Sequence, residues 1–239
     1  MLNAVEYLDH PDADFPSPQQ ALEEPNGLLA IGGDLSPGRL LHAYRNGIFP
    51  WFNDGDPILW WSPNPRAVFD LSSLKISRST QRSARRGQWH YSVNQAFEAV
   101  IAACAEPRNG DPSTWICTPM RQAYLQLHRL GHAHSIEVWH QSRLIGGLYG
   151  VGVGGVFCGE SMFHRCTDAS KAAVWALSRE AKVLGVELID AQILNPHLIA
   201  LGAQSVSRSQ FLERLTQLRN RPVPWSNWRH PVRHFHEPD

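Results

Sequence analysis

Residues 144–192 have the sequence LIGGLYGVGVGGVFCGESMFHRCTDASKAAVWALSREAKVLGVELIDAQ. This segment predicts a strand over residues 144–151, a turn at Gly154 and Gly155, and a second strand over residues 156–163. A helix follows over residues 169–184, with Asp168 as its cap and Gly185 as its end, and then a strand over residues 186–192. Such an order of strands and helix is typical of a mixed sheet with helices packed on it.

The segments before this one continue the same pattern. Residues 135–139 predict a strand, and residues 78–86, 94–104 and 119–130 predict helices. We therefore expect an α+β (mixed α/β) domain over residues 63–239, in which a mixed sheet is flanked by helices. The part played by the Arg- and His-rich tail after residue 217 is left open.

Residues 1–62 differ from the rest because they are rich in proline and in turn signals. One helix is well specified there, with Ser36 as N-cap, Pro37 at its first position and Gly47 at its end. The run Ser62-Pro63-Asn64-Pro65 predicts a linker, because a residue that precedes proline is disfavoured in the helical region. We place a domain boundary there, which gives a small N-terminal domain of residues 1–62.

The composition excludes several classes of protein. The chain has 239 residues, 43% of them apolar, and no run approaches the 18 apolar residues of a membrane span. The first residues are acidic and lack an apolar core, so they do not predict a secretory signal. The four cysteines lack metal-ligand spacing, and His132 with His134 needs further ligands from afar, so we expect no metal site. These features predict a cytoplasmic protein with reduced thiols.

The net charge is zero, with 22 Lys and Arg against 22 Asp and Glu, but the charges are segregated. Residues 1–38 hold acids and no Lys or Arg, whereas residues 75–90 hold basic residues and no acid. On a helix, Arg78, Arg82, Arg85 and Arg86 form a stripe, and their mutual repulsion disfavours that helix unless an anion compensates. The stripe is therefore either a solvated face or a phosphate-binding surface, and the use of arginine without acids favours phosphate.

The strand over residues 186–192 ends in two polar side chains. A period of two places them on the same face as Val186 and Leu188, so Asp190 and Gln192 close an apolar face. Open α/β sheets place ligand crevices at the carboxyl ends of strands, which favours a site. The alternative is a solvated strand end, where polar residues cost nothing.

Glu160 places a second carboxylate inside an apolar strand. Alternation gives it the same face as Val156, Cys158 and Met162. If that face points inward, Glu160 has to be paired or functional, because an unpaired buried charge is costly. If that face points outward, Glu160 is an ordinary surface residue and does not indicate a functional site. The common nucleotide-binding glycine motifs and the serine-hydrolase elbow are absent from the sequence.

Taken together, these residues resemble the leucyl/phenylalanyl-tRNA–protein transferase family. The resemblance is carried by FPSP at 15–18, EPNGLLAIGGDLSP at 24–37, GIFPWF at 47–52, ILWWSP at 58–63, GHAHSIEVW at 131–139, GESMF at 159–163, ASK at 169–171, LIDAQ at 188–192 and LGA at 201–203. It runs in order from about residue 15 to residue 213.

The resemblance implies a soluble enzyme that moves Leu or Phe, and Met less well, from aminoacyl-tRNA to proteins with an N-terminal Arg or Lys. The new N-terminus marks the acceptor for degradation by the N-end rule. It also implies a GNAT-like acyltransferase domain after the small N-terminal domain. An aminoacyl ester is already activated, so we expect no cofactor and no metal, and we expect a monomer.

The resemblance also implies roles for particular residues. Asp190 and Gln192 match the catalytic pair, and we expect Asp190 to orient Gln192, whose carbonyl accepts a hydrogen bond from the attacking amine. Glu160 lies in the same site and is expected to attract the cationic acceptor. Trp51 and Trp115 are expected near the terminal adenosine of the tRNA. An apolar pocket for the aminoacyl side chain is expected to contain Leu148, Phe157, Met162, Leu177 and Ile189.

Two other functions remain open from the sequence. A CoA-dependent N-acetyltransferase could share the fold, but residues 164–169, HRCTDA, lack the Gly-rich pyrophosphate loop that it needs. A non-catalytic RNA-binding protein would explain the arginine stripe and the aromatic residues. It would leave Asp190, Gln192 and Glu160 unexplained.

Overall fold

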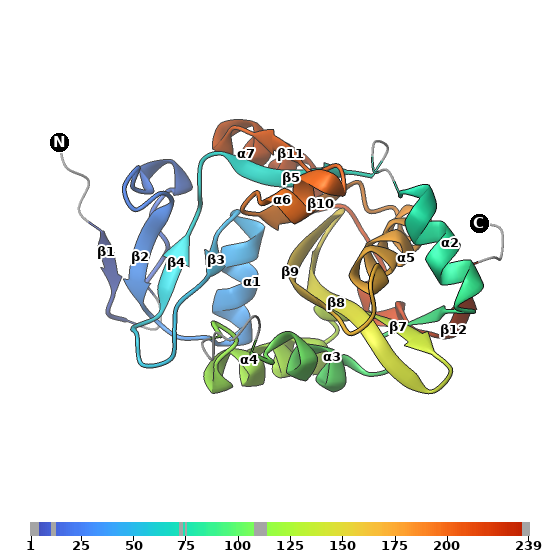
Figure 1. The fold of residues 1–239 in the computed structure, drawn as a ribbon. Coiled ribbons are helices and arrows are strands. Elements are labelled where there is room, and N and C mark those ends of the chain that lie inside the picture. Colours follow the sequence, from blue (N-terminus) through green and yellow to red (C-terminus); the bar gives the residue numbers. More distant parts are fainter. Residues whose placement is uncertain (1–4, 11–12, 72–73, 75, 108–113, 236–239) are drawn as a thin grey trace.

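The chain forms a small sheet followed by a large one (Figure 1). The computed structural model describes residues 5–10, 13–71, 74, 76–107 and 114–235. The small sheet has the order β1-β2-β4-β3, with bounds β1 Glu6–Leu8, β2 Leu28–Gly32, β3 Phe49–Pro50 and β4 Leu59–Trp61. A short 3-10 helix, Pro18–Gln20, and α1, Pro37–Arg45, belong to the same part of the chain.

The large sheet has eight strands in the order β11-β5-β10-β9-β8-β7-β6-β12. Their bounds are β5 Arg66–Asp70, β6 His90–Val93, β7 Ala133–His140, β8 Arg143–Val153, β9 Val156–His164, β10 Leu188–Gln192, β11 Gln204–Val206 and β12 His230–His234. Its helices are α2 Arg78–Arg86, α3 Phe97–Cys104, α4 Thr118–Arg129, α5 Ala169–Leu184, α6 Pro196–Ala200 and α7 Arg208–Leu218. In this sheet all neighbouring strands are antiparallel except β9 and β10, which are parallel and are joined through α5.

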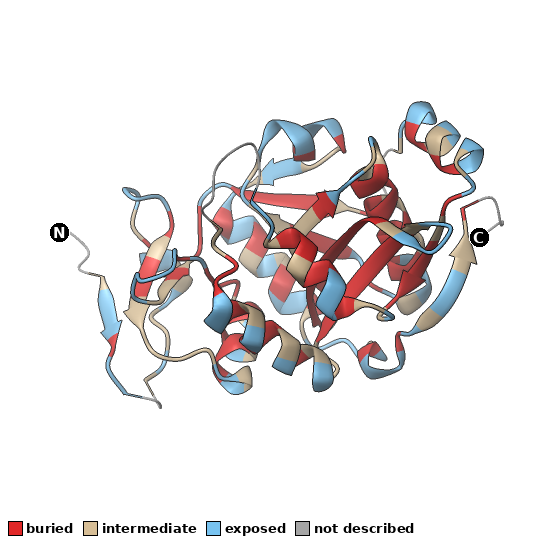
Figure 2. Cartoon of the chain, turned by 60° about the horizontal axis from the view of Figure 1, so that its bottom comes forward, coloured by how far each residue is buried: buried red, intermediate tan, exposed pale blue. Residues whose placement is uncertain are grey.

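Helices cover both faces of the large sheet, as the sequence predicts. The apolar side of α5 packs with Phe157 and Ile189 on one face. The other face packs against α1, α3, α4 and α7 and includes Val156 and Leu188. Figure 2 shows the central strands almost wholly buried between these layers. The mixed α/β fold is confirmed, and the boundary proposed at residues 62 and 63 falls between β4 and β5.

Two local predictions have different outcomes. Ser36 caps α1 as predicted, because its hydroxyl accepts a hydrogen bond from the backbone N–H of Arg39. Asp168 stands at the N-cap position of α5, as predicted, but its side chain does not cap the helix. Asp168 has a φ of +69° and makes no capping bond. Its carboxylate instead accepts hydrogen bonds from Lys171 on α5 and from Ser83 on α2, so it ties the two helices together.

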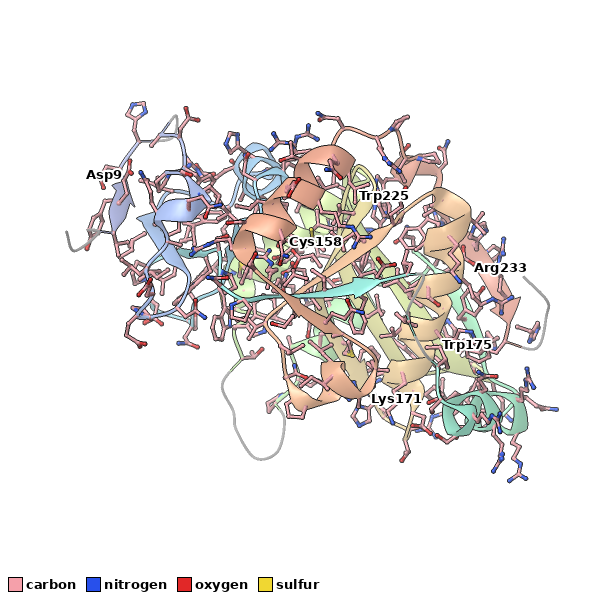
Figure 3. All side chains as sticks on the ribbon, turned by 90° about the horizontal axis from the view of Figure 1, so that it is seen from above. Asp9, Cys158, Lys171, Trp175, Trp225 and Arg233 are labelled. Carbon is pink, nitrogen blue, oxygen red and sulfur yellow. The ribbon has the colours of Figure 1, made fainter. Side chains whose placement is uncertain are left out.

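The tail after residue 217 completes the core. It contains the end of α7, a 3-10 helix, Trp225–Asn227, and the edge strand β12. Trp225 and Trp228 are buried with Phe157, and the Trp225 ring lies where a Cβ on Gly152 would stand. Figure 3 locates Trp225 and, on β12, Arg233. Among the described residues, no helix is long and apolar enough to cross a membrane.

We predict that the tail stabilises the whole domain. Trp228 is 2% exposed, so Trp228→Ala is expected to lower the free energy of unfolding by about 3–5 kcal/mol. The control is Val232→Ala, which removes a side chain of the same tail that is 51% exposed and is expected to cost less than about 0.5 kcal/mol. Urea unfolding of both variants measures the difference. Equal effects would show that the tail is not part of the core.

Candidate active site

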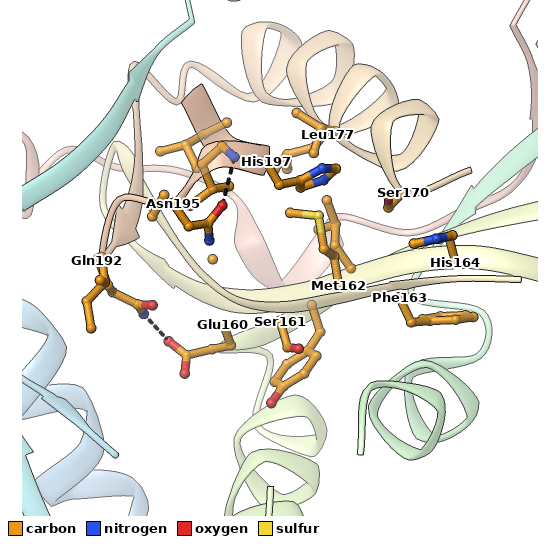
Figure 4. Close-up of a pocket in the computed structure, with 18 of the residues that line it drawn as sticks. Glu160, Ser161, Met162, Phe163, His164, Ser170, Leu177, Gln192, Asn195 and His197 are labelled. Atoms are coloured by element: carbon orange, nitrogen blue, oxygen red, sulfur yellow. Dashed lines mark hydrogen bonds between the residues drawn. The ribbon is translucent and has the colours of Figure 1, made fainter. Parts of the chain in front are cut away.

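A cavity of about 1000 Å³ opens where β9 and β10 separate (Figure 4). The two strands are paired from Leu188 with Val156 up to Asp190 with Cys158, and the pairing ends there. The next residues of both strands, 159–165 and 191–193, line the cavity, together with residues of β3, β8, α5 and α6. The parting of the one parallel strand pair in the large sheet therefore creates the cavity.

One side of the cavity is apolar. All five side chains predicted for the aminoacyl pocket line it, namely Leu148, Phe157, Met162, Leu177 and Ile189. Phe157 and Leu177 are almost fully buried, and the group packs with the inner side of α5. Trp51 and Trp115, predicted to lie near the adenosine, also line the cavity, and Trp51 is 42% exposed.

The prediction that Met162 shares a face of β9 with Cys158 is wrong. The pairing of β8 with β9 is irregular between Tyr149 and Gly150, so that Glu160 is an extra residue in β9. Alternation therefore shifts after Glu160. Met162 lies on the α5 face with Leu148, its partner across the strands, whereas Cys158 lies on the opposite face. This irregularity brings both the carboxylate and the apolar side chain to the cavity.

Glu160 and Gln192 form the polar side of the cavity. The Nε2 atom of Gln192 donates a hydrogen bond of 2.8 Å to Oε1 of Glu160, drawn in Figure 4. Gln192 has a φ of +58°, in the left-handed region, and the pairing of β10 with β5 shifts between Asp190 and Gln192. A non-glycine residue in that region is strained unless its surroundings hold it.

Asp190 supplies that support from beneath the cavity. It is 1% exposed and does not line the cavity, so it can act on the site only through its neighbours. Its Oδ1 atom accepts a hydrogen bond of 3.0 Å from the backbone N–H of Gln192. The same carboxylate makes two bonds with Arg66, of 2.8 Å to Nε and 2.6 Å to Nη2. Asp190 is thus placed to position Gln192.

Arg66 is held as firmly as its partner. Its side chain is buried, its Nη1 donates to the carbonyl of Gly47, and its guanidinium lies 4.9 Å from the ring centre of Phe49 and 4.4 Å from that of Phe211. Sequence reasoning missed Arg66. The available signal was an arginine at the start of the apolar run 67–69, which needs a partner if it is buried.

Two tyrosines reach Glu160 from the opposite side, and sequence reasoning also missed them. The hydroxyl of Tyr124 on α4 donates to Oε2 of Glu160 at 2.7 Å. The hydroxyl of Tyr44 on α1 lies 2.5 Å from that of Tyr124. Burial raises the pKa of Glu160 to about 7, although hydrogen bonds from the tyrosines and Gln192 oppose the rise. Both tyrosines lie on apolar helix faces, which predict only core positions.

The predicted arginine stripe lies outside the cavity. Arg78, Arg82, Arg85 and Arg86 are exposed on α2, whose basic side chains extend away from the body in Figure 3, where α2 is teal. Within the described residues, none of the four has an ion-pair partner; Lys75 of the same basic run lies outside those residues. The helix that carries the stripe nevertheless lies next to the cavity wall. Ser83 on α2 donates to Asp168, which precedes the first turn of α5, and Ser170 in that turn lines the cavity.

Histidines form part of the cavity wall near α5. His164 and His197 line the cavity and are labelled in Figure 4. Burial, together with the electrostatic effects of Lys171 and His164, lowers the pKa of His197. In the parts of the chain that the structure describes, no group of three or more His, Cys, Asp or Glu side chains is arranged to hold a metal ion.

The chain is similar to known proteins over most of its length. Residues 68–216 match the family model described as leucyl/phenylalanyl-tRNA protein transferase, and residues 33–64 match its N-terminal domain. The leucyl/phenylalanyl-tRNA–protein transferase of Shewanella pealeana is 58% identical, covering 95% of this chain and 97% of its own. The enzyme of that name from Shewanella halifaxensis is 57% identical over 95% and 96%.

Solved structures show weaker likeness. L-PGS from Bacillus licheniformis has a TM-score of 0.42 at 11% identity, covering 70% of this chain and 54% of its own. A GCN5-related N-acetyltransferase from Kribbella flavida has a TM-score of 0.37 at 12% identity, over 72% and 61%. The match of both family models and the identity to curated relatives show that this chain belongs to the leucyl/phenylalanyl-tRNA–protein transferase family.

Proposed function

We propose that the chain transfers Leu or Phe, and Met less well, from aminoacyl-tRNA to the N-terminal amine of acceptor proteins that begin with Arg or Lys. The observation that carries this proposal is one cavity in which apolar side chains face the Glu160–Gln192 pair. The apolar side suits an aliphatic or aromatic aminoacyl side chain. The polar side suits an attacking amine and a cationic acceptor. In the cytoplasm, such transfer would mark acceptors for degradation by the N-end rule.

The reaction that we propose is aminolysis of an ester. The acceptor nitrogen attacks the carbonyl carbon of the aminoacyl ester, a C–N bond forms, and the C–O bond to the ribose breaks. The amine loses a proton and the leaving ribose oxygen gains one, with the adjacent ribose hydroxyl as the relay. The ester is already activated, so the step needs neither ATP nor a metal nor CoA.

The geometry favours a positioning role for Gln192. Its amide nitrogen donates to Glu160, which leaves its carbonyl oxygen as the atom that can accept a hydrogen bond from the attacking amine. An amide is a very weak base, and holding the amine against the ester is therefore its larger contribution. Asp190, fixed by Arg66, keeps the backbone of Gln192 in place.

A CoA-dependent acetyltransferase is less well supported. A pyrophosphate would need the N-terminus of α5. That position carries the carboxylate of Asp168, which would repel the phosphates, and the preceding residues contain no glycine.

The direct test is transfer of radiolabelled Leu from Leu-tRNA to a peptide beginning with Arg, without ATP, CoA or added metal. We expect labelled peptide. The control is the same peptide with an acetylated N-terminus, which has no amine to attack and should remain unlabelled. No transfer to the free peptide under any of these conditions would overturn the proposal.

Glu160 is predicted to give the transfer rate part of its pH dependence. With a pKa of about 7, its carboxyl is protonated below neutral pH and ionised above it, so activity rises as pH increases through 7. The acceptor amine, with an ordinary pKa of about 7.7–8.0, titrates nearby and must also lose a proton. Well below pH 7, log kcat/KM should therefore rise with a slope near 2 for the parent.

Glu160→Gln removes one of the two titrating groups. We expect its slope to fall to about 1 and its kcat/KM at pH 8 to fall at least about tenfold, which is about 1.4 kcal/mol of barrier. The pH profile of single-turnover transfer measures both. An unchanged slope would show that Glu160 is not the titrating group.

Gln192→Ala is predicted to slow the chemical step with little loss of stability, because the side chain faces the cavity rather than the core. We expect single-turnover transfer to slow at least about tenfold. Gln204→Ala, exposed on β11, is the matched control and should leave the rate unchanged. A rate for Gln192→Ala within about threefold of the parent, under about 1 kcal/mol, would rule out a role in the reaction.

The arginine stripe is predicted to bind acceptor-stem phosphates without reading sequence. Arg82→Ala/Arg85→Ala should weaken aminoacyl-tRNA binding. If each arginine neutralises one phosphate, it should also reduce the slope of log K against log salt by about 1.8. Arg121→Ala/Arg129→Ala removes the same charge from α4 and serves as the control. Equal slopes for the two double variants would show that the stripe is only a solvated face.

A further inference from the structure

We propose, on the basis of the function proposed above, that Tyr124 and Tyr44 are positioning residues that keep Glu160 ionised for transfer. The N-terminal domain would then contribute to the reaction through α1, which carries Tyr44. Neither tyrosine lines the cavity, so both act through Glu160 rather than on the substrate.

The direction of the hydrogen bonds follows from counting protons. A tyrosine hydroxyl has one proton to donate, and that of Tyr124 goes to Oε2 of Glu160 at 2.7 Å. The hydroxyl of Tyr44, 2.5 Å away, must therefore donate to the oxygen of Tyr124. This makes a chain of donors that all point toward the carboxylate. Each bond is strongest when Glu160 is negatively charged, because a charged acceptor strengthens the whole chain.

The groups that stabilise the ionised form of Glu160 are neutral hydrogen-bond donors. Across the described residues, Glu160 has no ion-pair partner, and the guanidinium of Arg66 is bound to Asp190. The groups that act on it are Tyr44 on α1, Tyr124 on α4, Cys158 on β9, and Asp190 and Gln192 on β10. Behind these, Tyr149 on β8 packs against Tyr124, and Arg66 on β5 binds Asp190. Asp190 opposes ionisation through its negative charge, and burial opposes it more strongly. The direct donors Tyr124 and Gln192, with Tyr44 bonded behind Tyr124, are thus what favours the charged form.

The tyrosines themselves stay protonated. Burial and the charge of Glu160 raise the pKa of Tyr44 and of Tyr124 well above the ordinary value of 10.0. Both are at most 1% exposed, so neither hydroxyl is open to solvent. Their effect on the reaction is therefore an effect on the ionisation of Glu160.

The test is the pH profile of transfer by Tyr124→Phe and Tyr44→Phe, which keep the rings and remove one hydroxyl each. For Tyr124→Phe we expect the titration of Glu160 to move up by about one pH unit, a tenfold change in its ionisation equilibrium. Transfer should then fall about fivefold at pH 7 and recover to near the parent rate at pH 9. Tyr44→Phe should shift the profile in the same direction by less.

The matched control is Tyr91→Phe. Tyr91 is also buried, and its hydroxyl donates at 3.0 Å to a buried carboxylate, that of Glu180, which does not line the cavity. This variant loses the same kind of bond, and we expect its pH profile to match the parent. A loss of transfer by Tyr124→Phe that is equal at every pH, or a shift in Tyr91→Phe of the same size, would overturn the inference.

A second measurement does not depend on transfer. The carboxyl stretch of Glu160, assigned by its absence from Glu160→Gln, can be titrated by infrared spectroscopy in the free protein. An upward shift in Tyr124→Phe supports the inference even if no transfer is found, which would then count against the proposed function alone. An unmoved titration overturns the inference even if transfer is confirmed.

Discussion

The geometry of the site depends on the buried ion pair between Arg66 and Asp190. Removing two charges from water is costly, and the cost is met here by paired hydrogen bonds, a third bond to the carbonyl of Gly47 and the faces of two aromatic rings. The pair joins β5 to β10 in the large sheet, and its bond to Gly47 ties both to the segment that follows α1. Loss of either partner would leave a buried charge and cost about 3–5 kcal/mol.

What the pair holds in place is the end of β10. Asp190 fixes the strained backbone of Gln192, and Gln192 in turn holds one oxygen of Glu160. Tyr124 holds the other oxygen from the opposite side. The two polar side chains at the mouth of the parted strands are thus fixed from beneath and from both sides. An arrangement fixed before substrate arrives suits a reaction that depends mainly on positioning.

Much of this could be predicted from the sequence, because strong local patterns decide most of the central strands and helices, and the family resemblance implied the five apolar side chains of the cavity. Features that depend on distant partners could not. Arg66 and Asp190 are 124 residues apart, and only the folded sheet brings them together. The alternation of apolar residues also does not reveal the extra residue in β9. That residue places Met162 on the other face of the sheet. The tail carries no regular pattern, yet Trp225 and Trp228 complete the core.

In the function proposed above, the parted strands hold the aminoacyl end of a tRNA with its carbonyl beside Gln192. A crystal structure with a non-hydrolysable amide of leucine and 3′-amino-adenosine would test it most directly. We expect the leucine side chain against Leu148, Phe157 and Leu177, the adenosine against Trp51 and Trp115, and the amide of Gln192 next to the leucyl carbonyl. An adenosine bound on the apolar side of the cavity, or a leucyl carbonyl beyond hydrogen-bonding distance of Gln192, would contradict this placement.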